Sequence, residues 1–167
     1  MTPLSLIWRV GDLLLATGVE SVVEVLPPLA SWHAPTVPTW IRGLFSYRGR
    51  LIPLVDVARL LELPTSPDRM ANRVLVVRCG SPDSVLWSAG LWIDALIDID
   101  RIDFSSSAAH PGFAVESGRF LGSVVQTRFG HVQQCQQVPC MLRTHFSCSR
   151  SIGLTRCRSK PASRTAA

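Results

Sequence analysis

The chain has 167 residues, of which 47% are apolar and 17% are charged. This length and apolar fraction can fill a core, which excludes wholesale disorder. No run approaches 18 consecutive apolar residues, so the sequence predicts no membrane-spanning helix. The first residues also lack the basic region of a secretory signal, so we expect a cytoplasmic protein.

The formal charge of +5 is the sum of two unlike parts of the chain. All twelve acids lie between Asp12 and Glu116, whereas residues 117–167 carry seven arginines, Lys160 and no acid. Four of the five cysteines also lie in this second part. The change in composition predicts a folded body over residues 1–127 and an atypical basic tail over residues 128–167.

The first half of the body alternates short β-prone runs with glycine and proline turns. Residues 19–26 fit either a helical turn or a strand, because their apolar positions satisfy both periods. Asp56 can cap a short helix over residues 57–63. The expected strands are 4–10, 13–17, 43–47 and 50–55, the last two joined at Arg48-Gly49.

A polar linker, residues 64–72, separates this half from a second β-rich unit. The expected extended segments of that unit are 73–79, 85–93, 94–102 and 120–127. Many short strands with few helices predict an all-β barrel or sandwich. The linker favours two small barrels, over about 4–63 and about 72–127.

No enzyme motif is visible in the sequence. There is no phosphate-binding glycine loop and no nucleophile elbow, and His33 and His110 sit in proline-containing loops without a nucleophile partner. Isoleucines separate the acids that follow Trp92, which favours an alternating strand over a calcium loop. These acids are Asp94, Asp98, Asp100 and Asp103. We therefore expect no catalytic residue, no cofactor and no metal.

The tail holds soft metal ligands, but at spacings that structural zinc sites do not use. These ligands are His131, Cys135, Cys140, His145, Cys148 and Cys157. The basic tail also raises an alternative function, a small-barrel nucleic-acid binder that neutralises phosphates. A solvated tail is the favoured interpretation, and we expect no nucleic-acid partner.

A linear pattern over Glu20–Leu61 carries the most information. It runs from Val-x-Glu-Val at Glu24, through Pro-x-x-Ile-x-Gly ending at Gly43, to Arg-Gly-x-x-Ile-Pro-x-Val-Asp ending at Asp56. Gly90-Leu91-Trp92-Ile93-Asp94 follows in the second half. From about Leu4 to Thr127 this pattern resembles the CheW-like domain of bacterial chemosensory systems.

The resemblance implies two intertwined five-stranded SH3-like barrels around a shared core, with short helices and an irregular C-terminal tail. It also implies a non-catalytic scaffold that couples chemoreceptor tips to the regulatory domain of a CheA-like histidine kinase, in chemotaxis or a related pathway such as surface sensing. No direct membrane insertion is expected.

The resemblance places Arg48 where the family has an arginine associated with receptor binding. Glu24 matches an acid on the first barrel, which faces the kinase, and Gly49 matches a glycine that sets the backbone. The same stretch adds Tyr47 and Phe45 to the expected partner-binding residues. The alternative for Arg48 is a solvated turn arginine or an intramolecular ion pair.

Receptor tips are helical hairpins, so we expect an apolar docking face near Arg48. The candidates for that face are Leu44, Phe45, Leu51 and Ile52. Alternate members of this set must face the core, and the sequence leaves open which ones do.

The family pattern breaks after Gly130, where four glutamines and Pro139 replace the expected closing strand. A shift of reading frame near residues 127–132 and a lineage-specific tail both account for this break. In either case we expect the chain from Gly130 onward to be poorly packed, leaving an unpaired sheet edge.

Overall fold

The computed structural model describes residues 2–65, 67–79, 87–105 and 121–135 of the chain. The elements are β1 (Leu4–Val10), β2 (Leu13–Gly18), the 3-10 turn η1 (Val19–Ser21), β3 (Val22–Leu26), β4 (Ile41–Tyr47), β5 (Arg50–Asp56), α1 (Val57–Leu60), β6 (Arg73–Cys79), β7 (Trp87–Ile93), β8 (Ala95–Arg101), β9 (Leu121–Thr127) and β10 (Gly130–Cys135). Within these ranges, none of the helices has the length and apolar character needed to cross a membrane.

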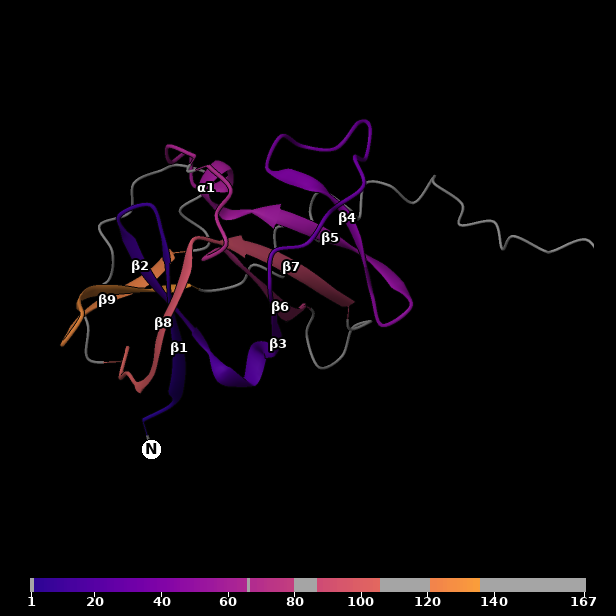
Figure 1. The fold of residues 1–167 in the computed structure, drawn as a ribbon. Helices are drawn as coiled ribbons and strands as arrows, with labels where there is room; N and C mark the ends of the chain where they lie inside the picture. The colour runs from indigo at the N-terminus through magenta and orange to yellow at the C-terminus, as the bar shows by residue number, and fades with distance from the viewer. Residues whose placement is uncertain (1, 66, 80–86, 106–120, 136–167) are drawn as a thin grey trace, which may run out of the picture.

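The strands form two five-stranded sheets, which lie side by side in Figure 1. One sheet has the order β8-β1-β2-β10-β9, and the other has the order β3-β6-β7-β5-β4. We call the first sheet A and the second sheet B. The expectation of an all-β fold with two five-stranded units is confirmed.

Local predictions agree with most of these elements. Residues 19–26 contain both of the predicted structures, because the helical turn η1 is followed by the strand β3. Asp56 caps α1 as expected, because its carboxylate accepts a hydrogen bond of 3.1 Å from the backbone N–H of Arg59. The helix is shorter than predicted, and Glu62 with its φ of 56° lies just beyond it. Residues 85, 86 and 120, at the starts of the expected segments 85–93 and 120–127, lie outside the described residues.

Three apolar layers make up the core, and one of them joins the two sheets. A central layer between the sheets contains Trp8 and Leu15 from sheet A and Leu75 and Leu91 from sheet B, all fully buried. A second layer inside sheet B centres on Phe45, and a third inside sheet A centres on Val132. Because alternate residues of a strand point to opposite faces, one strand serves two layers.

Neither sheet comes from one continuous stretch of chain. Sheet A combines β1 and β2 with the distant strands β8, β9 and β10, while sheet B takes strands from both sides of the 64–72 linker. Strand pairing thus interleaves the two halves of the sequence and extends the folded body to Cys135, past the boundary predicted at Thr127.

The expectation of poor packing from Gly130 is wrong for residues 130–135. β10 lies inside sheet A, where it pairs with β2 in parallel and with β9 in antiparallel orientation. Val132 is fully buried, and the Gln133 side chain donates a 3.3 Å hydrogen bond to the Gly122 carbonyl oxygen. The glutamines argued against a strand here, but a strand tolerates a buried amide that has a hydrogen-bond partner. A frameshift before Val132 is therefore not needed to explain this stretch.

The packing inside sheet B explains the glycine of the Gly-Leu-Trp-Ile-Asp motif. A Cβ atom at Gly90 would lie 2.6 Å from a ring carbon of Phe45 and 2.8 Å from a methyl of Val74. Only a glycine lets the Phe45 ring lie directly against β7. The ring in turn supports the strand that leads into the β4–β5 hairpin.

Candidate functional site

The β4–β5 hairpin ends in a two-residue turn formed by Arg48 and Gly49. Both residues have positive φ angles, 48° and 77°, as a type I′ turn requires. Glycine adopts this conformation freely, whereas for arginine it costs about 1–2 kcal/mol. The turn projects Arg48 away from the body, so its side chain is 70% exposed.

Arg48 and Tyr47 both contact Glu24, which comes from the opposite edge of sheet B. The Tyr47 hydroxyl donates a 2.7 Å hydrogen bond to Glu24 Oε2, and an Arg48 Nη lies 3.0 Å from the same oxygen. The Arg48 guanidinium also lies 5.2 Å from the centroid of the Tyr47 ring. We call these three residues the hairpin clasp. The clasp joins β3 to β4, the two outer strands of sheet B.

The clasp changes the acidity of two of its members. The hydrogen bond from Tyr47, followed by the interactions with Arg48, lowers the pKa of the Glu24 carboxyl. The same hydrogen bond from the phenol to Glu24 raises the pKa of Tyr47. Each shift favours the anionic carboxylate beside the neutral phenol, which is the state that the hydrogen bond requires.

The structure brings together four of the five predicted partner-binding residues and separates the fifth. Glu24, Tyr47, Arg48 and Gly49 meet at the hairpin clasp and its turn. Phe45 is only 2% exposed and packs inside sheet B, so it supports the hairpin from beneath. Arg48 also forms an intramolecular ion pair, which the sequence analysis gave as the alternative to partner binding. Most of the five guanidinium N–H donors lie outside that pair.

Register decides which neighbouring apolar residues face outward. Phe45 and Ile52 are paired across the hairpin and both are buried. Leu51 lies opposite Ser46 and is 62% exposed, while Leu44 is half-buried. The apolar face expected beside Arg48 thus reduces to Leu51 and part of Leu44.

A second exposed apolar surface was not predicted from the sequence. Leu96 and Ile99 of β8 lie opposite Trp8 and Leu6 of β1, whose side chains face the central layer. Directly opposed residues share a face, so Leu96 and Ile99 point toward that layer from the open edge of sheet A. They are nevertheless 40% and 49% exposed.

The β3 edge of sheet B also carries an exposed apolar residue on its central-layer face. Val25 of β3 lies opposite Leu75, a central-layer residue, and is 36% exposed. The turn that leads into β3, η1, contacts β1, the strand beside β8 in sheet A. We call Leu96, Ile99 and Val25 the edge strip. A signal for it was present in the isoleucines of the Asp-rich strand.

The Asp-rich segment is the alternating strand that its pattern predicts. Arg128, from the β9–β10 turn, lies 2.8 Å from Asp98 and 3.4 Å from Asp100 on β8. These pairs join the two outer strands of sheet A, as the hairpin clasp joins those of sheet B. Within the described ranges, no group of three or more His, Cys, Asp or Glu side chains could hold a metal ion.

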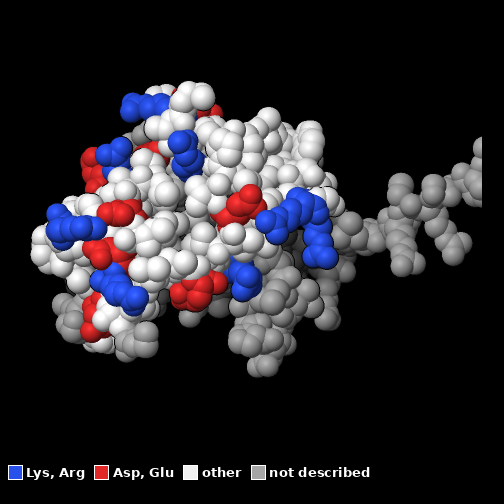
Figure 2. All heavy atoms as spheres, turned by 60° about the horizontal axis from the view of Figure 1, so that its bottom comes forward, with Lys and Arg blue, Asp and Glu red and all other residues white. Residues whose placement is uncertain are grey.

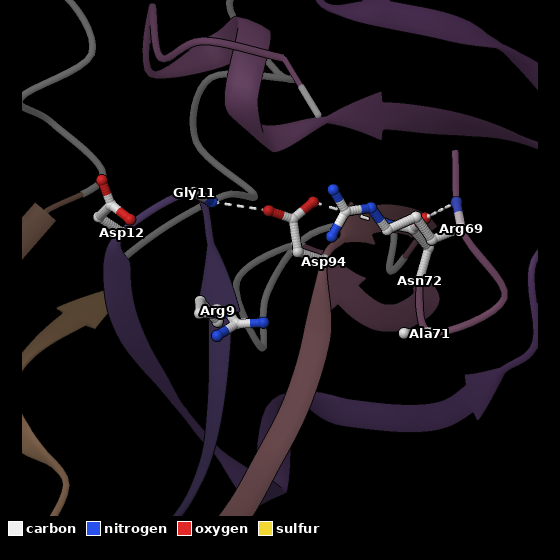
Figure 3. Close-up of a pocket in the computed structure, with 7 residues that line it drawn as sticks. All are labelled: Arg9, Gly11, Asp12, Arg69, Ala71, Asn72 and Asp94. Carbon is white, nitrogen blue, oxygen red and sulfur yellow. Dashed lines mark hydrogen bonds between the residues drawn. The ribbon is translucent and has the colours of Figure 1, made fainter. Parts of the chain in front are cut away.

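Asp94 lines a small polar cavity of about 230 Å³, shown in Figure 3. Its carboxylate accepts hydrogen bonds from the Gly11 backbone, at 2.7 Å, and from the Asn72 side chain, at 3.4 Å. Asn72 is 2% exposed and also donates to the Ile93 carbonyl oxygen. The motif aspartate therefore holds the β1–β2 turn against the start of β6.

Cys135 points into the central layer and not toward a metal site. Burial raises the pKa of its thiol to about 12, opposed by a weaker hydrogen bond with Thr17. Because only the thiolate reacts with alkylating agents, we expect Cys135 to stay unmodified by iodoacetamide at pH 8 in the native protein. Peptide mass mapping should find it modified only after unfolding in urea. Rapid native modification of Cys135 would contradict the packing of β10.

Comparison with families of known proteins identifies the family of the chain. The CheW-like domain family matches residues 5–139, which is most of the chain. The chain therefore belongs to the CheW-like domain family. The match extends beyond β10 and so includes the strand that the composition had assigned to the tail.

Individual relatives are distant. The chain is 37% identical to protein PilI of Pseudomonas aeruginosa over 70 residues, which covers 42% of this chain and 39% of PilI. It is 29% identical to protein FrzA of Myxococcus xanthus over 119 residues, or 71% of each chain. The alignment with PilI thus spans less than half of that protein.

A solved structure supports the fold. The crystal structure of the scaffolding protein TtCheW from Thermoanaerobacter tengcongensis superimposes with a TM-score of 0.72. The superposition covers 81% of this chain and 90% of TtCheW at 20% sequence identity. At this identity the likeness establishes the SH3-like fold alone.

Proposed function

We propose that this chain is a non-catalytic adaptor of chemosensory signalling, which couples chemoreceptor tips to the regulatory domain of a CheA-like histidine kinase in the cytoplasm. Membership of the CheW-like domain family supports the adaptor role. The hairpin clasp carries the assignment of a binding surface, because it presents an exposed Arg48 at the end of the β4–β5 hairpin.

Arg48 suits a polar anchor for a helical partner. A guanidinium keeps its charge at any physiological pH and offers five N–H donors, which match carboxylates and the free carbonyls at a helix C-terminus. Arg48 has a left-handed backbone conformation, which glycine or asparagine would adopt with less strain. Strain of this kind concentrates at sites that have a function.

The edge strip supplies an apolar surface on the opposite face of β3 from Glu24. Val25 follows Glu24 directly along β3, so the strip and the clasp share one edge of sheet B. Helical partners dock by laying an apolar face against such a surface. We assign the receptor side of the adaptor to Arg48 and the edge strip together.

The nucleic-acid alternative has less support. Residues 1–135 carry eleven arginines and twelve acids, so the folded body has no excess of positive charge. On the face shown in Figure 2, basic and acidic side chains are interspersed. Phosphate recognition depends on a concentrated basic surface, which this face lacks.

Co-sedimentation with receptor-containing membranes tests the proposal. We expect the protein to pellet with membranes that carry a chemoreceptor of the same organism and to stay in the supernatant with receptor-free membranes. Equal sedimentation with both membranes would contradict receptor binding. Salt-sensitive binding to mixed oligonucleotides, lost on removing residues 136–167, would instead favour the nucleic-acid alternative.

A further inference from the structure

We propose that Tyr47 is a positioning residue of the partner-binding site, whose hydroxyl fixes Glu24 so that Glu24 holds Arg48 in one outward orientation. The inference rests on the proposed function and adds a third residue to the Arg48–Glu24 pair. The inference gives the Tyr47 hydroxyl a role of its own, in addition to the packing of the Tyr47 ring.

The Tyr47 ring is anchored, whereas its partners are not. The ring is half-buried and packs against the layer inside sheet B that contains Phe45 and Ile52. Glu24 and Arg48 have side chains 39% and 70% exposed. A pair this open to solvent holds no fixed geometry alone, because water competes for both charges and ordering long side chains costs entropy.

The hydroxyl supplies the missing constraint. Its 2.7 Å hydrogen bond ends on Glu24 Oε2, the same oxygen that the Arg48 Nη approaches at 3.0 Å. Glu24 therefore receives one donor from a fixed ring and one from a mobile chain. The fixed donor places the carboxylate, and the carboxylate then places the guanidinium.

This arrangement leaves most of the guanidinium available. One Nη is directed to Glu24, and the guanidinium carries five N–H donors in total. Preorganising such a donor set lowers the entropy lost when a partner binds. Tyr47 thereby raises affinity without contacting the partner itself.

The chain offers a direct spectroscopic test, because Tyr47 is its only tyrosine. Absorbance at the phenolate band during an alkaline titration therefore reports Tyr47 alone. We expect the phenol to titrate above its ordinary pKa in the wild type and to move back toward that value in Glu24→Ala. An identical titration in both proteins would show that the hydrogen bond is absent in solution and would overturn the inference.

Binding of Tyr47→Phe to receptor-containing membranes tests the consequence. The phenyl ring keeps the packing, so the melting temperature should stay within a few degrees of the wild type. Affinity should fall at least threefold, while Ser46→Ala, which removes the exposed neighbouring hydroxyl, should bind like the wild type. In a Glu24→Ala background, Tyr47→Phe should cause no further loss.

The pH profile separates positioning from packing. The Glu24 carboxyl has a lowered pKa, so the ion pair with Arg48 is complete above that pKa and is lost as pH falls through it. Tyr47 and Arg48 are the groups that act on this carboxyl. Removing the hydroxyl takes away the larger cause of the lowering, so Tyr47→Phe should lose binding at a higher pH than the wild type does.

The outcomes distinguish this inference from the proposed function. If Arg48→Glu abolishes binding but Tyr47→Phe binds with wild-type affinity and an unchanged pH profile, the positioning role is wrong and the docking site stands. If Arg48→Glu binds like the wild type, the assignment of the docking site itself is wrong.

Discussion

Arg48→Glu should weaken association with receptor-containing membranes at least tenfold while leaving the fold intact. The side chain is 70% exposed and contributes little to packing, so the melting temperature and the near-UV circular dichroism should match those of the wild type. The binding loss follows because the substitution removes the guanidinium donors and puts a second carboxylate beside Glu24. A sedimentation titration measures the affinity.

Arg50→Glu is the matched control for this experiment. Arg50 is exposed and begins β5 on the other side of the turn. The substitution Arg50→Glu changes the charge by the same amount in the same hairpin. We expect its binding loss to stay below threefold. Equal losses in the two variants would indicate a general effect of charge and would contradict a specific role for Arg48.

Val132→Asp should abolish cooperative folding, or lower the free energy of unfolding by several kcal/mol, on the order of the whole stability of a small domain. Val132 is fully buried in sheet A, between Leu14 of β2 and Val125 of β9. A carboxylate there has to lose its water without gaining a partner, which is among the costliest single changes in a protein core. Chemical denaturation measures the effect.

His131→Asp provides the control, because His131 is exposed and precedes Val132 on the same strand. It should leave the free energy of unfolding within about 0.5 kcal/mol of the wild type. A Val132→Asp protein that unfolds cooperatively with wild-type stability would show that β10 is not part of the folded body. A shortened chain that ends at Pro139 should fold like the full chain, and one that ends at Arg128 should not.

The sequence predicts strands well where the pattern is local. Glycine and proline turns bound β1, β2, β4 and β5 closely, and Asp56 marks the start of α1. The two-residue turn at Arg48-Gly49 was also visible, because a glycine after a polar residue between apolar runs is a hairpin signal. These features depend on neighbours in the chain.

Features that depend on distant residues were missed. Composition argued against β10, whose parallel pairing with β2 joins two segments far apart in sequence. The edge strip was likewise hidden, since alternation shows two faces of β8 but not that one of them continues the central layer. The burial of Phe45 was hidden for the same reason, because it depends on packing against Gly90 of the distant strand β7.

The hairpin clasp lies between these two cases. The resemblance to the family pointed to Glu24 and Arg48, and their 3.0 Å contact closes sheet B. The shared carboxylate oxygen, which links Tyr47 to the pair, could not be read from residues 23 positions apart. It requires the curvature that brings the outer strands of sheet B together.

Reconstitution of receptor-coupled kinase activity tests the adaptor role most directly. Membranes carrying a chemoreceptor are mixed with a CheA-like kinase of the same organism, with and without this protein, and kinase autophosphorylation is measured. We expect the receptor to control the kinase only when the wild-type protein is present, and we expect Arg48→Glu not to replace it. Kinase activity that stays the same at every concentration of the folded protein would contradict the adaptor role.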